Sequence, residues 1–181
     1  MKYLFITILL GALSISTLAE ECPSFTPEQS YLLGVAYIIG NQANEPLHTI
    51  TKQPVGHTMA AILWKESFIQ EKIFRYNPHD PSYGVMNVTF RAYLETQGIR
   101  DMSYSTIQSH TNIINTLLTD DFEAIKIGYK YLSNKIILHK DLWKGVKGYN
   151  GAGWRATAYM NDVKDRVKLL SKCKTFDNIY M

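Results

Sequence analysis

Glu66 is a carboxylate in an unexpected position of this sequence. Around it, apolar side chains recur at helical spacing and define one face of a helix: Met59, Ile62, Leu63, Ile69 and Ile73. Glu66 falls on this apolar face, whereas Lys65 and Glu71 fall on the opposite one. Burying an unpaired charge is costly, so the position predicts a carboxyl that keeps its proton near neutral pH and can act as a general acid. The alternative is an ordinary glutamate that is paired with Arg75 or Arg155, or solvated.

The elements that must position Glu66 are predicted to be helices. Apolar periodicity and capping residues favour helices over residues 27–40, 58–70, 89–97, 105–118, 121–136 and 156–172. Residues 41–56 are expected to form a loop, residues 76–86 are rich in turn signals, and residues 143–153 are interrupted by glycines. No stretch alternates for long enough to build a sheet. The sequence therefore predicts a mainly α, compact domain with a short β-hairpin near Tyr83 to Val88.

The N-terminus has the pattern of a secretory signal. Lys2 supplies a positive start, residues 4–18 form an apolar run, and Thr17-Leu18-Ala19 fits a cleavage site. We therefore expect a signal peptide over residues 1–19, a single domain over residues 20–181, and export to the periplasm or beyond the cell. An uncleaved anchor is the alternative, and Glu21 argues against lipidation of Cys22.

Composition and cysteine content narrow the function classes. The formal charge of the 181-residue chain is +3, and its basic residues are scattered, which argues against nucleic acid as a partner. Cys22 and Cys173 are the two cysteines and flank the domain, so in an exported protein they are expected to form one disulfide. The five histidines show no metal-ligand spacing, and no cofactor is implied.

Several short motifs occur in a fixed order along the chain. They are Glu66-Ser67, Gly84-Val85-Met86-Asn87, Gly128-Tyr129-Lys130-Tyr131-Leu132, Gly148-Tyr149-Asn150-Gly151-Ala152 and Tyr159-Met160-Asn161-Asp162-Val163. Together they resemble the soluble lytic transglycosylase family, which has a goose-type lysozyme fold. The resemblance covers residues 27–170 and is strongest to small periplasmic members associated with envelope-spanning secretion and conjugation systems.

The resemblance implies a function and a set of site residues. The chain would cleave the β-1,4 bond between N-acetylmuramic acid and N-acetylglucosamine in peptidoglycan strands and leave a 1,6-anhydromuramic product. Glu66 would be the sole catalytic acid and base. The residues expected to support the cleft or contact substrate are Ser67, Met86, Asn87, Tyr149 and Asn150. Components of a secretion or conjugation system would be further partners.

The sequence also departs from the family pattern and leaves other functions open. Asn87 stands where the family has glutamine, so we expect Asn87→Gln to preserve or raise activity if the turn has the family geometry. A hydrolytic muramidase would need a second carboxylate, for which Asp80 is the candidate. A catalytically inactive peptidoglycan-binding assembly protein is the third possibility. Tyr149 could equally be a core tyrosine, and Ser67 a surface serine.

Overall fold

The computed structural model of the chain describes residues 21–42, 47–69, 72–79 and 81–177. Its helices are α1 (Pro27–Asn41), α2 (Leu47–Thr51), α3 (Gly56–Ser67), α4 (Phe90–Thr96), α5 (Tyr104–His110), α6 (Asn112–Thr119), α7 (Asp121–His139), α8 (Leu142–Asn150) and α9 (Gly153–Lys172). The prediction of a mainly α domain is confirmed. None of these helices is long and apolar enough to cross a bilayer. The predicted signal peptide lies outside the described residues.

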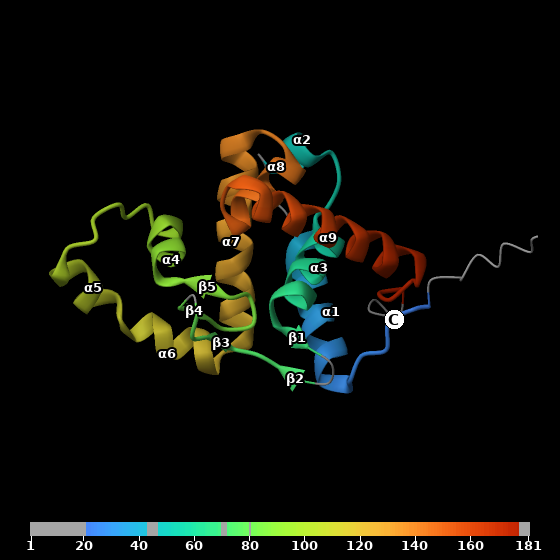
Figure 1. Cartoon of the computed structure of the whole chain (residues 1–181), viewed down its shortest axis with the longest axis horizontal. Coiled ribbons are helices and arrows are strands. Elements are labelled where there is room, and N and C mark those ends of the chain that lie inside the picture. The colour runs from blue at the N-terminus through green and yellow to red at the C-terminus, as the bar shows by residue number, and fades with distance from the viewer. Residues whose placement is uncertain (1–20, 43–46, 70–71, 80, 178–181) are drawn as a thin grey trace, which may run out of the picture.

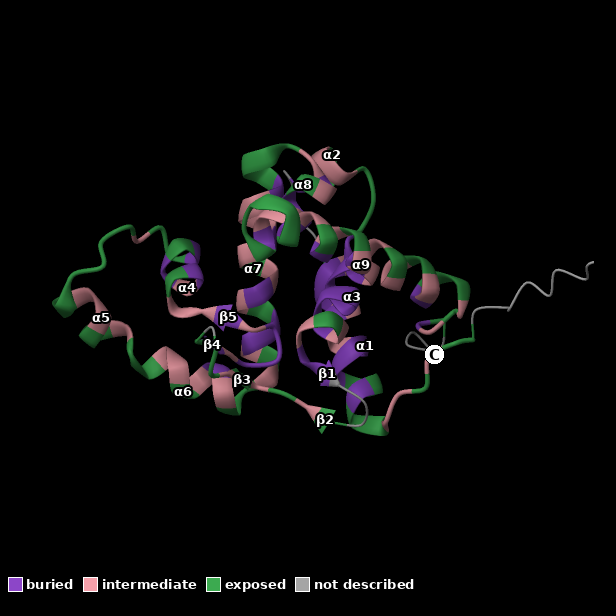
Figure 2. Ribbon diagram, viewed as in Figure 1, coloured by how far each residue is buried: buried purple, intermediate pink, exposed green. Residues whose placement is uncertain are grey.

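Helix α3 lies at the centre of the fold. It packs against α1 and α9, and α7 stands beside this group and also contacts α1 and α8 (Figure 1). The apolar face predicted around Glu66 is buried in the part of the helix that precedes the last turn. Met59 and residues 60–63 are fully inaccessible to solvent there. In Figure 2, α3 is largely buried, whereas α7 beside it has buried, intermediate and exposed segments. The catalytic candidate is therefore carried by the most deeply buried helix.

Short strands follow α3 and form the predicted hairpin region. Strands β1 (Phe68–Ile69) and β2 (Lys72–Ile73) form one antiparallel pair. Strands β3 (Tyr76–Asn77), β4 (Ser82–Tyr83) and β5 (Val88–Thr89) form a second, three-stranded sheet. Tyr83 pairs with Val88, so the hairpin between these two residues is confirmed. This hairpin contains the Gly84–Asn87 motif.

Four expectations about element boundaries were wrong. The helix around Glu66 stops at Ser67, since Phe68 is already extended, and Ile69 and Ile73 belong to strands instead. Residues 41–56 include the short helix α2, and the expected helix from residue 105 is divided into α5 and α6. The glycine-rich residues 143–153 contain the regular helix α8. Asp141 caps α8 by accepting a hydrogen bond from the backbone N–H of Lys144.

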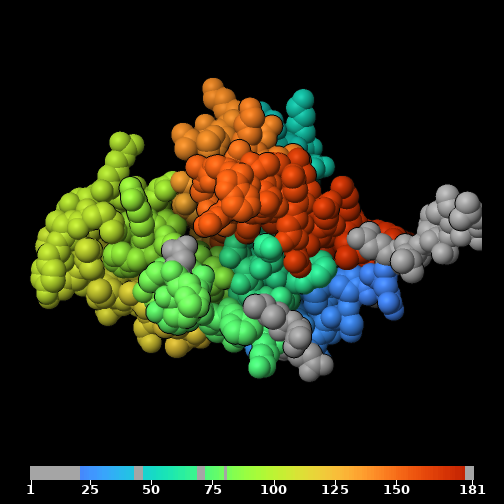
Figure 3. All heavy atoms as spheres, in the orientation of Figure 1, coloured from blue at the N-terminus to red at the C-terminus, as the bar shows by residue number. Residues whose placement is uncertain are grey.

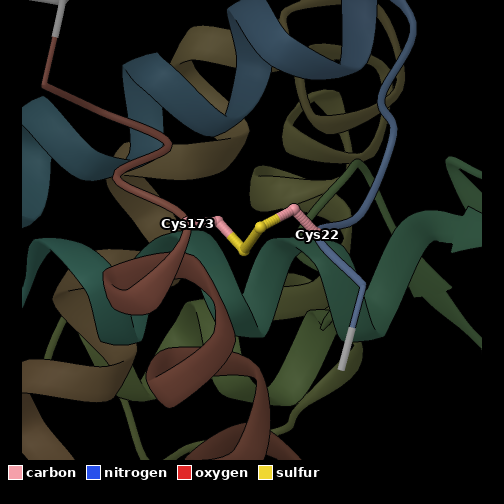
Figure 4. Close-up of a disulfide and its surroundings, with 2 residues drawn as sticks. All are labelled: Cys22 and Cys173. Atoms are coloured by element: carbon pink, nitrogen blue, oxygen red, sulfur yellow. A yellow bond between two sulfur atoms is a disulfide. The ribbon is translucent and has the colours of Figure 1, made fainter. Parts of the chain in front are cut away.

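The predicted disulfide between Cys22 and Cys173 is present. It joins the segment before α1 to the C-terminal end of α9, and the two Cα atoms are 5.7 Å apart (Figure 4). The bond closes a loop with a sequence separation of 151 residues. It therefore ties together the two ends of the folded domain.

Candidate active site

The Glu66 side chain lies in the last turn of α3 and is partly buried. The Tyr159 hydroxyl, on α9, donates a hydrogen bond of 2.5 Å to Glu66 Oε1. Asn87 Nδ2 donates to the other carboxyl oxygen, Oε2, at 3.2 Å, and to the Glu66 backbone oxygen at 2.7 Å. Both carboxyl oxygens thus meet neutral donors from distant parts of the chain. Arg75, one of the partners that the sequence offered for Glu66, forms salt bridges with Glu28 and Asp121.

The turn that carries Asn87 depends on two glycines. Gly84 has a φ of +71°, and a Cβ there would lie 2.5 Å from the Leu117 backbone oxygen. Gly128 on α7 lets Met86 approach the helix backbone, because a Cβ at Gly128 would lie 2.7 Å from Met86 Cβ. These two contacts seat the turn tightly against α6 and α7. The glycine of the Gly128–Leu132 motif is thereby explained by packing.

Two side chains then fix the backbone of this turn. The Ser67 hydroxyl donates to the Val85 carbonyl oxygen at 2.6 Å, and the Tyr149 hydroxyl donates to the Met86 carbonyl oxygen at 2.7 Å. Ser67 and Met86 are fully buried, whereas Asn87 is partly accessible. Since buried polar groups need partners, these bonds join α3, the turn and α8 into one unit. Ser67 and Met86 position the cleft, while direct substrate contact stays a prediction for Asn87, Tyr149 and Asn150.

The two tyrosines near Glu66 remain protonated. Burial raises the pKa of Tyr159 well above its ordinary value, and the nearby negative charge of Glu66 raises it further. Burial and the same charge also raise the pKa of Tyr149. Tyr159 is therefore a hydrogen-bond donor throughout the neutral range. The Tyr149 hydroxyl donates to the Met86 carbonyl, which supports the turn beside Glu66.

An ion-pair cluster holds α9 against α3 one helical turn from Tyr159. Asp162 forms salt bridges with Lys65 on α3 and with Arg166 on its own helix. Burial alone would raise the pKa of Asp162, but the hydrogen bond from Lys65 and the charge of Arg166 bring it below its ordinary value. The Arg166 guanidinium also lies 4.4 Å from the centre of the Trp64 ring. These contacts set the separation between Tyr159 and Glu66.

Two hollows meet at Asn87. The first, of about 380 Å³, is lined by Glu66, Phe74, Tyr76, Asn77, Pro78, His79 and Asn87. The second, of about 140 Å³, is lined by Asn87, Val88, Thr89, Ala92, Tyr131, Tyr149, Asn150 and Gly151. In the space-filling view, the green surface of the strand region lies below the orange and red surface of α8 and α9 (Figure 3). Glu66 lines the first hollow, and Asn87 is the lining residue that the two hollows share.

The sequence identified part of this site and missed part of it. The first hollow is lined by the predicted residues Glu66 and Asn87. The second is lined by Asn87, Tyr149 and Asn150, of which Asn150 is exposed at the end of α8. Tyr159 was placed on a buried helix face but not beside Glu66. The signal that could have found it is its phenol, since a buried tyrosine hydroxyl usually has a partner. Phe74, Tyr76 and His79 were also missed, because exposed aromatic residues in a turn-rich segment carry no periodic pattern.

The described residues offer little to a metal ion. No group of three or more histidine, cysteine, aspartate or glutamate side chains gathers at one place in these parts of the chain. What the arrangement can do chemically is exchange a proton at Glu66, with Tyr159 and Asn87 as fixed donors.

Comparisons with known proteins leave the function open. The chain is similar to the uncharacterized 20.7 kDa protein in the vs-regB intergenic region of Enterobacteria phage T4. The two are 28% identical over 182 residues, which cover 94% of this chain and 96% of the phage protein. No family model matches the chain, and no solved structure gives a significant match. The resemblance to lytic transglycosylases therefore rests on the motif residues.

Proposed function

We propose that this protein is an exported lytic transglycosylase that cleaves the β-1,4 bonds of peptidoglycan strands. The observation that carries the proposal is the setting of Glu66. Its carboxyl is partly buried, meets hydrogen-bond donors on both oxygens, and lies at the edge of a hollow with exposed aromatic rings. Phe74 and Tyr76 are 40% and 48% exposed and offer flat apolar faces to a sugar ring.

The chemistry proposed for Glu66 has two proton transfers. In its acid form Glu66 gives a proton to the glycosidic oxygen, and the bond from this oxygen to C1 of the muramic sugar breaks. The resulting carboxylate then takes the proton of the C6 hydroxyl of the same sugar, whose oxygen bonds to C1. The products are a free 4-hydroxyl on one strand and a 1,6-anhydro ring on the other. No water is consumed, so the reaction is that of a lyase.

A single carboxylate is enough for this reaction, whereas hydrolysis by water needs a second one. Among the described residues that line the hollow, Glu66 is the one carboxylate. This favours the transglycosylase over the muramidase. Asp80, the residue expected to activate water in a muramidase, lies outside the described residues.

The disulfide supports the proposed location. Disulfides persist in oxidising compartments such as the periplasm, where peptidoglycan is also found. The Cys22–Cys173 bond and the predicted signal peptide therefore point to the same compartment.

The test is product analysis by mass spectrometry after incubation of the disulfide-bonded protein with purified peptidoglycan. The proposal expects fragments that end in 1,6-anhydromuramic acid. If the wild-type protein instead produces fragments with reducing ends, and the Asp80→Asn variant does not produce them, the result would support the muramidase. Binding without any cleavage would identify an inactive peptidoglycan-binding protein.

A further inference from the structure

Asn87 connects the carboxyl group of Glu66 to both hollows. It is the residue common to their linings. Its Nδ2 atom satisfies the Glu66 backbone oxygen, one of the carbonyls that a helix end leaves without a helical partner. The φ of Asn87 is +46°, a left-handed conformation that asparagine tolerates better than most residues. The backbone turn and the end of α3 are thus both arranged around this one amide.

The other end of the same amide is a buried oxygen. Asn87 Oδ1 is inaccessible to solvent and, among the side chains that the structure describes, is the buried polar atom without a hydrogen-bond partner. Leaving a buried acceptor unsatisfied costs free energy, and such atoms are rare in folded proteins. Because Asn87 lines both hollows, a rotation of its amide would bring Oδ1 within reach of an N–H donor in one of them.

The amide also favours one form of Glu66. A hydrogen bond donated to a carboxyl oxygen stabilises the carboxylate, whereas an oxygen that carries a proton cannot face an N–H group. The bond from Asn87 to Oε2 is 3.2 Å long, against 2.5 Å for the bond from Tyr159 to Oε1. The Oε2 contact is therefore the easier of the two to give up. A rotation of the amide that brings Oδ1 toward a hollow turns Nδ2 away from Oε2 and also from the Glu66 backbone oxygen.

We propose that Asn87 is a positioning residue that couples substrate binding to the state of Glu66. In the free protein its Nδ2 holds the Glu66 carboxylate. When an acetamido N–H of a bound amino sugar bonds to Oδ1, the amide rotates and Oε2 is released to carry the proton. The ligand class is taken from the function proposed above. The coupling itself is a property of this site that can be measured without catalysis.

Other groups near Glu66 act on it from several elements and stay unchanged in the variants below. Tyr159 and Asp162 face it from α9, with Asp162 neutralised by Lys65 and Arg166. Tyr149 faces it from α8, and His79 lines the same hollow. A difference between the wild-type protein and an Asn87 variant therefore reports on the amide.

The test follows the Glu66 carboxyl carbon by NMR in disulfide-bonded protein labelled with ¹³C-glutamate, with Glu66→Gln to assign its signal. The titration midpoint is measured with and without a tetramer of N-acetylglucosamine. Asn87→Gly removes the amide and suits the positive φ. Lys140→Gly is the matched control, because Lys140 has a φ of +52° at the exposed end of α7. Asn87→Ala, which removes the amide without adding a charge, replaces the glycine variant if that variant does not fold.

The proposal expects the midpoint of the wild-type protein and of Lys140→Gly to rise when the tetramer binds. In Asn87→Gly the midpoint of the free protein is already higher, the tetramer changes it less, and the tetramer binds about 2- to 10-fold more weakly. Two results would overturn the proposal. One is a titration midpoint of Glu66 in ligand-free Asn87→Gly that equals that of the wild type, and the other is a wild-type midpoint that does not change when the tetramer binds.

Failure of the proposed function would look different. If the midpoint changes are observed but the protein does not cleave peptidoglycan, the coupling is supported and the transglycosylase assignment is wrong. A protein that forms anhydro products while Asn87→Gly titrates like the wild type keeps the assignment and loses the coupling.

Discussion

The Tyr159 hydroxyl lies 2.5 Å from Glu66 Oε1, although the two residues are 93 positions apart in the chain. The contact joins the last turn of α3 to α9, two helices that pack against each other along much of their length. It holds the carboxyl with a donor that burial and the charge of Glu66 keep protonated. The orientation of the proposed acid therefore depends on the C-terminal helix.

Tyr159→Phe should lower kcat about 10- to 100-fold and leave KM within about twofold, since a hydrogen bond to a charged group contributes about 1.5–3 kcal/mol. The ring packing is retained, so the protein should stay folded. Initial rates on soluble peptidoglycan fragments give both constants. Tyr104→Phe is the control, because Tyr104 is 80% exposed. Equal rates for Tyr159→Phe and the wild type would show that the contact does not serve catalysis.

Asn87→Gln should lower activity about tenfold, in contrast to the sequence-based expectation. Glutamine tolerates the φ of +46° less well than asparagine does. Its longer side chain also moves the amide away from the backbone oxygen and the Oε2 atom of Glu66. Melting temperature and cleavage rate measured together separate a strained turn from a lost contact. Full or increased activity in this variant would restore the expectation that the turn has the family geometry.

Reduction of the Cys22–Cys173 disulfide should lower the melting temperature and leave cleavage largely intact at moderate temperature. The loop of 151 residues sets an upper limit of about 5 kcal/mol for its stabilisation by chain entropy. Neither cysteine lines the two hollows. Thermal melts with and without reductant, and of the Cys22→Ser/Cys173→Ser variant, measure the effect. Loss of activity at temperatures where the reduced protein is folded would contradict the structural role.

The Asp162 cluster should make stability depend on pH in the acid range. The pKa of Asp162 in the folded state lies below its ordinary value of 3.8, so its ion pairs stabilise the protein above that value and are lost as the pH falls through the folded pKa. Urea unfolding at about pH 7 and about pH 3 should show a smaller difference in Asp162→Asn than in the wild type. Asp165→Asn is the control, since the Asp165–Lys168 pair is largely exposed. The same pH dependence in both variants would contradict this role of Asp162.

Local rules predicted several features of the fold from sequence. Capping residues helped to predict the helices, and the structure has a capping box at Thr26 and Gln29 before α1 and an Asp120 cap before α7. The pairing of Cys22 with Cys173 and the hairpin at Tyr83 and Val88 were also predicted, because two cysteines allow one pair and the turn signals are local. The spacing of apolar residues did not predict the end of α3 at Ser67, because apolar residues continue into the strands and their spacing also fits a helix.

The sequence did not predict the contacts that build the site. The bond from Ser67 to Val85 and that from Tyr149 to Met86 depend on how α3, α7 and α8 pack, and no local pattern encodes their separation. The family resemblance identified Glu66 and the turn near it. It did not identify the partner of each carboxyl oxygen. Asn87 and Tyr159 supply these partners from 21 and 93 positions further along the chain.

The most direct test of the proposed function is Glu66→Gln, studied for turnover and melting temperature on the same sample. Glutamine keeps the size of the side chain and removes the ionisable proton. A positioned general acid contributes about 10²- to 10⁴-fold, so release of anhydromuramic products should fall to near background. The melting temperature should hold or rise, and peptidoglycan binding should persist. A Glu66→Gln protein that is destabilised yet still cleaves would contradict the assignment of Glu66 as the catalytic acid and base.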